Sequence, residues 1–85
     1  MAVSFVVALS TLPTSDKAAE IARVLVREGL IACMNILPQV RSVYFWDGEM
    51  CDSSEVMCVM KTRLDRVDVL RERLLSLHQI GRAHV

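Results

Sequence analysis

Several features are scarce in this 85-residue chain, and each scarcity excludes a class of protein. Ten lysine and arginine residues balance ten aspartate and glutamate residues, so no excess of charge favours binding to nucleic acid or an acidic membrane. No apolar run approaches the roughly 20 residues that a membrane-spanning helix needs. The opening segment, residues 1–9, lacks the basic residues of a secretory signal peptide. We therefore expect a cytoplasmic protein with no nucleic-acid or membrane partner.

Cysteine is rare as well. Cys33, Cys51 and Cys58 are odd in number and form no C-x-x-C pair, which indicates reduced thiols rather than a disulfide framework. Cys33 and Cys58 lie in apolar runs, where we expect small buried side chains, whereas Cys51 is expected to be more exposed. Because 53% of the residues are apolar, the chain is predicted to fold as one small domain rather than to be disordered.

The sequence motifs of common enzyme classes are missing. There is no glycine-rich nucleotide loop, no G-x-S-x-G elbow and no H-E-x-x-H pair. An acylphosphatase-like enzyme would need an arginine-bearing phosphate loop after the first strand, but residues 11–16 contain neither arginine nor glycine. We therefore expect that the protein is not an enzyme.

The first quarter of the chain predicts a strand followed by a helix. Residues 3–9 form an apolar run that is typical of a strand buried on both faces. Residues 16–28 place their apolar side chains on one helical face and their charged side chains on the other. Thr14 or Ser15 can cap the start of this helix, and Gly29 stands where a left-handed C-cap is expected.

A long β-hairpin is predicted next. Residues 30–37 and 41–46 are typical of one strand that Pro38 interrupts, as an edge or a bulge. Asp47 and Gly48 favour a two-residue type I′ turn, because both positions of that turn need a positive φ. A return strand then runs to about Lys61. This turn pairs Trp46 with Glu49, Phe45 with Met50 and Tyr44 with Cys51.

A second helix is predicted after the return strand. Residues 62–65 fit a capping box that ends in aspartate, and the apolar side chains that follow share one helical face. These side chains are Val67, Leu70, Leu74 and Leu77. The order strand, helix, strand, strand, helix predicts an α+β fold over residues 1–78, a ferredoxin-like βαββα(β) sandwich with the last strand missing.

Three of the four aromatic residues, Tyr44, Phe45 and Trp46, are adjacent. Successive side chains of a strand face opposite ways, so the three rings cannot all enter one core. Either a second chain covers the outward rings, or Tyr44 and Trp46 face the core of their own domain while Phe45 points away.

A set of residues at consistent spacing resembles the CutA family of divalent-cation tolerance proteins. The set is Ala32-Cys33-x-Asn35-Ile36, Pro38, Tyr44-x-Trp46-x-Gly48, Glu55 and Lys61-Thr62. The resemblance implies a homotrimer of PII-like architecture that is concerned with tolerance of copper or other divalent metals, with no established reaction. It also implies that the hairpin pairs with a neighbouring subunit, so that Tyr44, Phe45 and Trp46 form an interface.

The same resemblance suggests candidate ligand residues. The metal ligands proposed in bacterial relatives correspond here to Ser10, Leu77 and His78, of which only His78 is a usual ligand of Cu(II) or another divalent cation. Glu55 and Lys61 are candidates for lining a ligand cleft between subunits, and an ordinary ion pair is the alternative. The alternative function is a PII-like small-ligand sensor with incidental metal binding.

The end of the chain departs from the family pattern. Relatives continue after His78 with proline and a fourth strand, whereas residues 79–85 are Gln-Ile-Gly-Arg-Ala-His-Val. Residues 80–85 are what the string ATCGGAAGAGCACACGTC, a common sequencing-adapter read, encodes. We therefore expect residues 79–85 to be a non-native tail, and a chain without its native fourth strand to be poorly soluble.

Overall fold

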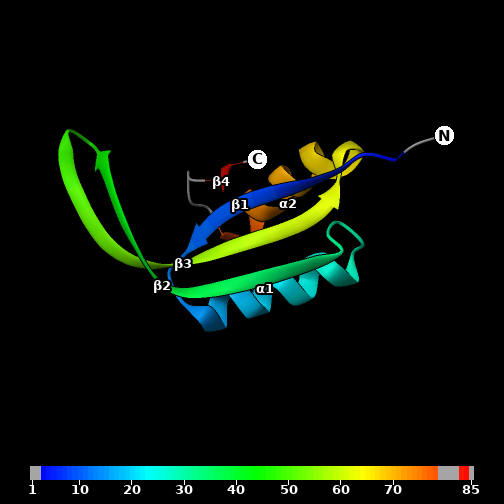
Figure 1. Cartoon of the computed structure of the whole chain (residues 1–85), viewed down its shortest axis with the longest axis horizontal. Helices are drawn as coiled ribbons and strands as arrows, with labels where there is room; N and C mark the ends of the chain where they lie inside the picture. The colour runs from blue at the N-terminus through cyan, green and yellow to red at the C-terminus, as the bar shows by residue number, and fades with distance from the viewer. Residues whose placement is uncertain (1–2, 79–82, 85) are drawn as a thin grey trace.

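The computed structural model describes residues 3–78 and 83–84. Its elements follow the expected order and build an α+β, ferredoxin-like fold (Figure 1). They are β1 (Phe5–Leu12), α1 (Ser15–Arg27), β2 (Cys33–Trp46), β3 (Glu49–Arg63), a 3-10 turn (Leu64–Arg66), α2 (Val67–His78) and β4 (Ala83–His84). The molecule measures 46 × 24 × 20 Å, because the far part of the β2–β3 hairpin projects from the body. We call this projecting part, residues 38–55, the arm.

The sheet is antiparallel, with the strand order β2-β3-β1-β4. The sequence predicted a ferredoxin-like sheet without its native fourth strand. In the structure, the two-residue β4 lies beside β1 and pairs only with Leu9 and Ser10. The free edge of β1 offers unpaired N–H and C=O groups, which a following segment can bind. Residues 5–8 of that edge have no partner strand in the described part of the chain. The predicted non-native tail lies outside the described residues, apart from the backbone of Ala83 and His84.

Both helices pack on one face of the sheet, and the core lies between these two layers. Alternate side chains of β1 and β3 enter this core together with the apolar stripes of α1 and α2, as the helical periodicities predicted. The largest fully buried side chains are Leu12, Ile21, Leu25, Met60, Leu70 and Cys58.

The predicted burial of the first strand on both faces is wrong. Ala8 and Leu12 face the helices and are buried, but Phe5 and Val7 on the other face remain 72% and 50% exposed. An apolar run such as this one, which only Ser4 interrupts, indicates that both faces are covered, but it does not say by which chain. Here only one face is covered by the described residues of this chain.

The two ends of α1 are capped as the sequence predicted. The side chain of Thr14 accepts a hydrogen bond from the backbone N–H of Lys17, at 3.1 Å, and so satisfies one of the free donors of the first turn. Gly29 follows the helix with φ +74°, a conformation that favours glycine.

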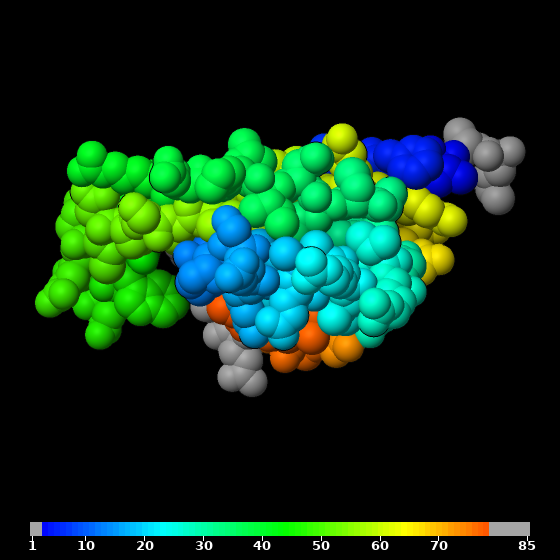
Figure 2. Space-filling model, turned by 90° about the horizontal axis from the view of Figure 1, so that it is seen from below, coloured from blue at the N-terminus to red at the C-terminus, as the bar shows by residue number. Residues whose placement is uncertain are grey.

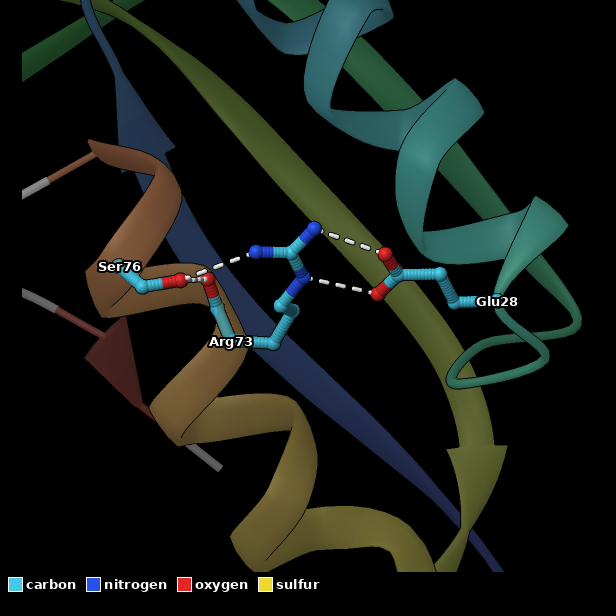
Figure 3. A network of polar contacts seen from close by, with 3 residues as sticks. All are labelled: Glu28, Arg73 and Ser76. Atoms are coloured by element: carbon cyan, nitrogen blue, oxygen red, sulfur yellow. Dashed lines mark hydrogen bonds and ion pairs between the residues drawn. The ribbon is translucent and has the colours of Figure 1, made fainter.

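A polar contact joins the end of α1 to α2 (Figure 3). The guanidinium group of Arg73 donates two hydrogen bonds to the carboxylate of Glu28, at 2.8 and 2.7 Å. Those hydrogen bonds lower the pKa of Glu28 and raise that of Arg73. Ser76, one turn further along α2, lies on the other side of the same guanidinium, at 3.4 Å.

The predicted capping box at residues 62–65 is wrong. β3 continues to Arg63, a 3-10 turn follows, and α2 begins only at Val67. Thr62 is buried, and its hydroxyl donates a 2.6 Å hydrogen bond to the carbonyl oxygen of Leu30. The hydroxyl therefore satisfies a backbone carbonyl of the loop between α1 and β2, which would be costly to bury without a hydrogen-bond donor.

The arm has the hairpin geometry that the sequence predicted. The register shifts between Leu37 and Val40, so Pro38 marks a β-bulge, and Gln39 within it has φ +61°. Asp47 and Gly48 both have positive φ, 52° and 78°, as a type I′ turn requires. The three predicted pairs across the turn are present: Trp46 with Glu49, Phe45 with Met50 and Tyr44 with Cys51.

Candidate functional site: the arm, the open sheet face and their polar groups

The arm carries its three aromatic side chains on alternate faces. Phe45 and Trp46 are 70% and 59% exposed, and Tyr44 is half-buried. None of the three belongs to the core cluster, so the alternative that Tyr44 and Trp46 face the core of their own domain is wrong. Two large rings are left in water at the tip of a projecting hairpin, which is typical of a contact surface.

Polar side chains form hydrogen bonds on each face of the arm. On the Tyr44 face, the tyrosine hydroxyl donates to Ser53 at 3.4 Å, and the Ser53 hydroxyl donates to the Glu55 carboxylate at 3.4 Å. On the opposite face, Arg41 donates two hydrogen bonds to Asp52, at 2.9 and 2.7 Å, and thereby lowers the pKa of Asp52. The Tyr44–Ser53 and Arg41–Asp52 pairs join the two strands of the arm and favour its observed register.

The second face of the sheet is covered by no described element. Its register brings apolar side chains of three strands to neighbouring positions. These are Phe5, Val7, Leu9, Leu37, Met57 and Val59, with Cys33, Asn35 and Lys61 at the far end. We call this surface the open face. The apolar run of residues 3–9 was the sequence feature that could have indicated the open face. The run does not, however, distinguish the residues that face the helices from those that face away.

The three thiols differ in burial. Cys58 is fully buried, as predicted, and burial raises its pKa to about 11. Cys33 was predicted to be buried, but it is half-buried, because it lies on the open face rather than against the helices. Cys51 is also half-buried, on the Tyr44 face of the arm, where its predicted greater exposure is limited by its strand neighbours.

Glu55 and Lys61 are not brought together within one chain. Glu55 lines a cavity of about 350 Å³ at the base of the arm, between the bulge and the start of α1. Lys61 lies further along β3, on the open face, paired with Val7 and Cys33. Six strand residues span roughly 20 Å. A cleft that contains both residues would therefore need one from each of two subunits.

The three positions for the implied metal site do not fit a metal ion. Ser10 is buried on β1, and Leu77 packs its apolar side chain against the core. His78 ends α2, and its Nε2 atom is buried without a hydrogen-bond partner in the described residues. Residues 3–78 and 83–84 contain no group of three or more His, Cys, Asp or Glu side chains that could hold a metal. A single imidazole does not supply the three or four ligands that a stable site needs.

His78 is expected to make the fold acid-sensitive. Burial lowers its pKa below the ordinary value of 6.5, and the nearby charge of Lys17 lowers it further. The unfolded chain therefore takes up the proton first, so this contribution to stability is present above about pH 6.5 and is lost as the pH falls through the folded pKa. Urea unfolding of the wild type and of His78→Leu, at a series of pH values from about 5 to 7.5, measures this. We expect a shallower loss in the variant; equal slopes would contradict the prediction.

The described helices include none that is long and apolar enough to span a membrane. Fold and surfaces together define an α+β, ferredoxin-like protein that carries an exposed aromatic arm and an open apolar sheet face. The chain belongs to the CutA1 divalent ion tolerance protein family, whose pattern matches residues 6–84.

Individual relatives agree with this assignment. The chain is 40% identical over 72 residues to the divalent-cation tolerance protein CutA of Thermus thermophilus, across 85% of this chain and 70% of the relative. It is 41% identical over 68 residues to a CutA homolog of Xenopus laevis, across 80% of this chain and 45% of the relative. The chain thus spans about half the length of this longer relative.

Solved structures show the same fold. The divalent cation tolerance protein of Thermus thermophilus superposes with a TM-score of 0.87 at 36% identity, covering 95% of this chain and 79% of that chain. The PII-like protein CutA from Nostoc sp. PCC 7120, solved in its apo form, superposes with a TM-score of 0.79 at 37% identity, covering 92% and 73%. The predicted family and fold class are confirmed.

Proposed function

We propose that this protein acts in divalent-cation tolerance as a cytoplasmic homotrimer, by binding and assembly rather than by catalysis. Membership of the CutA1 family supports the tolerance role, because relatives carry that name. The three unpaired cysteines suit a reducing compartment.

The observation that carries the assembly proposal is the apolar surface of the single chain. Phe5 on the open face and Phe45 and Trp46 on the arm are each more than half exposed. Soluble monomers rarely expose large apolar patches, so a second copy of the chain is the natural cover for both surfaces. The open face would pack inward in the trimer, and the arm would reach a neighbouring subunit.

A growth experiment tests the tolerance role. Expression of the chain in a copper-sensitive bacterial host is expected to raise the copper concentration that halves the growth rate. An empty vector and the assembly variant Trp46→Ala serve as controls, and equal protein levels are checked by immunoblot. A trimer of correct mass that gives no protection against copper, zinc or cobalt would contradict the role while leaving the assembly intact.

Direct copper binding by the protein is expected to be weak. Ser10 and Leu77 occupy two of the three family ligand positions and offer no strong ligand, so we expect calorimetry to show a low affinity for Cu(II). The double variant Ser10→Cys, Leu77→His is expected to bind at least about tenfold more tightly, a gain of about 1.4 kcal/mol. Tight Cu(II) binding by the unmodified protein that His78→Ala abolishes would contradict this expectation.

The second candidate function is a PII-like small-ligand sensor, and the cavity beside Glu55 favours it. Hydroxyl, amide and carboxylate groups line this cavity, from Thr14, Ser15, Gln39, Ser54 and Glu55. A panel of nucleotides and metabolites, screened by thermal shift on the wild type and on Glu55→Gln, distinguishes the two functions. A ligand that stabilises only the wild type would favour the sensor.

A further inference from the structure

A second cavity lies away from the arm, between the C-terminal half of α1 and the beginning of β2. The two elements run side by side there (Figures 1 and 2). The cavity has a volume of about 590 Å³, within the usual range for small-molecule sites. Val26 and Met34 contribute its apolar lining together with two alanines, and Cys33 also borders it. The charged residues in its lining are Arg23 and Arg27, with no acidic side chain.

These two arginines differ from every other arginine in the described residues. The others each have a partner: Arg41 with Asp52, Arg63 with Asp65, Arg66 with the Gly29 carbonyl, Arg71 with Asp68 and Arg73 with Glu28. Within residues 3–78 and 83–84, the side chains of Arg23 and Arg27 take part in no hydrogen bond or ion pair. Their spacing of four residues places them on adjacent turns of one helical face, so both guanidinium groups can reach one anion.

We propose that this cavity binds a small amphipathic carboxylate, an organic anion with an aliphatic or aromatic body. Arg23 and Arg27 would donate to the carboxylate, which matches the planar fork of a guanidinium group. The body of the ligand would lie on Val26 and Met34 and remove their apolar surface from water. A nucleotide suits the cavity less well, because its base and sugar would find few polar partners among these side chains. The site is separate from the arm and does not depend on the proposed metal-tolerance role.

Isothermal titration calorimetry with decanoate as the probe tests the site, below the micelle concentration of the probe. The wild type is expected to bind one decanoate per chain. 1-Decanol, which has the same aliphatic body without a charge, is expected to bind at least about tenfold more weakly, because it lacks the carboxylate to which the two guanidinium groups would donate.

Variants locate the binding site. The double variant Arg23→Gln, Arg27→Gln is expected to weaken decanoate binding at least about tenfold, whereas the control Arg71→Gln, on the exposed side of α2, is expected to bind as the wild type does. Val26→Asp, which places an acid in the cavity, is expected to weaken binding as well, and circular dichroism checks that each variant remains folded. The proposal is overturned if the wild type binds no decanoate, if 1-decanol binds as tightly as decanoate, or if the double arginine variant keeps the affinity of the wild type.

Discussion

Replacing Trp46 with alanine is expected to dissociate the proposed trimer into smaller species at low micromolar concentration. The ring lies at the tip of the arm and is 59% exposed in the single chain, so a partner chain can bury most of it. Its neighbours along the hairpin, Tyr44 and Phe45, supply further aromatic area on both faces. Truncating a desolvated aromatic anchor at the centre of an interface costs about 2–4 kcal/mol, which is enough to raise a dissociation constant about 30- to 1000-fold.

Light scattering coupled to size exclusion measures this effect over a range of protein concentrations. Val69→Ala is the matched control, because Val69 is 53% exposed on α2, away from the arm. The control is expected to keep the mass of the trimer at every concentration, and Trp46→Ala is expected to lose it first on dilution. A variant that stays trimeric at low micromolar concentration, or a wild type that is monomeric throughout, would contradict the proposed role of the arm.

The parts of the fold that sequence chemistry predicts well are those decided by a few neighbouring residues. Asp47 and Gly48 determine the turn, and the type of turn determines which residues pair along the arm. The C-cap at Gly29 was predictable for the same reason, because the positive φ after a helix depends on the residue at that one position. Pro38 cannot donate a hydrogen bond to a strand, so an interruption there is predictable even though its bulge geometry is not.

The parts that sequence chemistry does not predict depend on contacts between distant segments. Residues 62–65 fit a capping box, but Thr62 lies beside the loop at Leu30, and a buried carbonyl there competes for its hydroxyl. The apolar run of β1 gives no sign that one of its faces is left open, because a face covered by its own chain and a face covered by a partner look the same in sequence. The pairing of β4 with Leu9 and Ser10 was not predictable for the same reason, since it depends on the free edge of β1.

The sequence predicted some parts of the candidate site and missed others, for a related reason. The aromatic triplet signalled the arm because three adjacent rings on a strand cannot share one core. Strand geometry alone implies that Glu55 and Lys61 are roughly 20 Å apart, so a joint cleft requires two subunits. The cavity beside Arg23 and Arg27 could not be predicted, because it exists only where the end of α1 meets the beginning of β2.

Two leucines of β1 are expected to separate stability from assembly. Leu12 faces the helices and is fully buried, whereas Leu9 lies on the open face and is 39% exposed. Leu12→Ala leaves a cavity in the core and is expected to lower the free energy of unfolding by about 2–5 kcal/mol in every oligomeric state. Leu9→Ala removes the same atoms from the surface that the proposed trimer buries, so its cost is expected to appear mainly as weaker association.

Urea unfolding at two protein concentrations, together with scattering mass, distinguishes these effects. For Leu12→Ala the loss of stability should be large and similar at both concentrations, because the damage lies within one chain. For Leu9→Ala the loss should grow on dilution, because the stability of an associating protein includes the free energy of association. Equal losses for both variants at all concentrations would show that the open face is not an interface. A larger, concentration-independent loss for Leu9→Ala than for Leu12→Ala would mean that the faces of β1 are assigned the wrong way round.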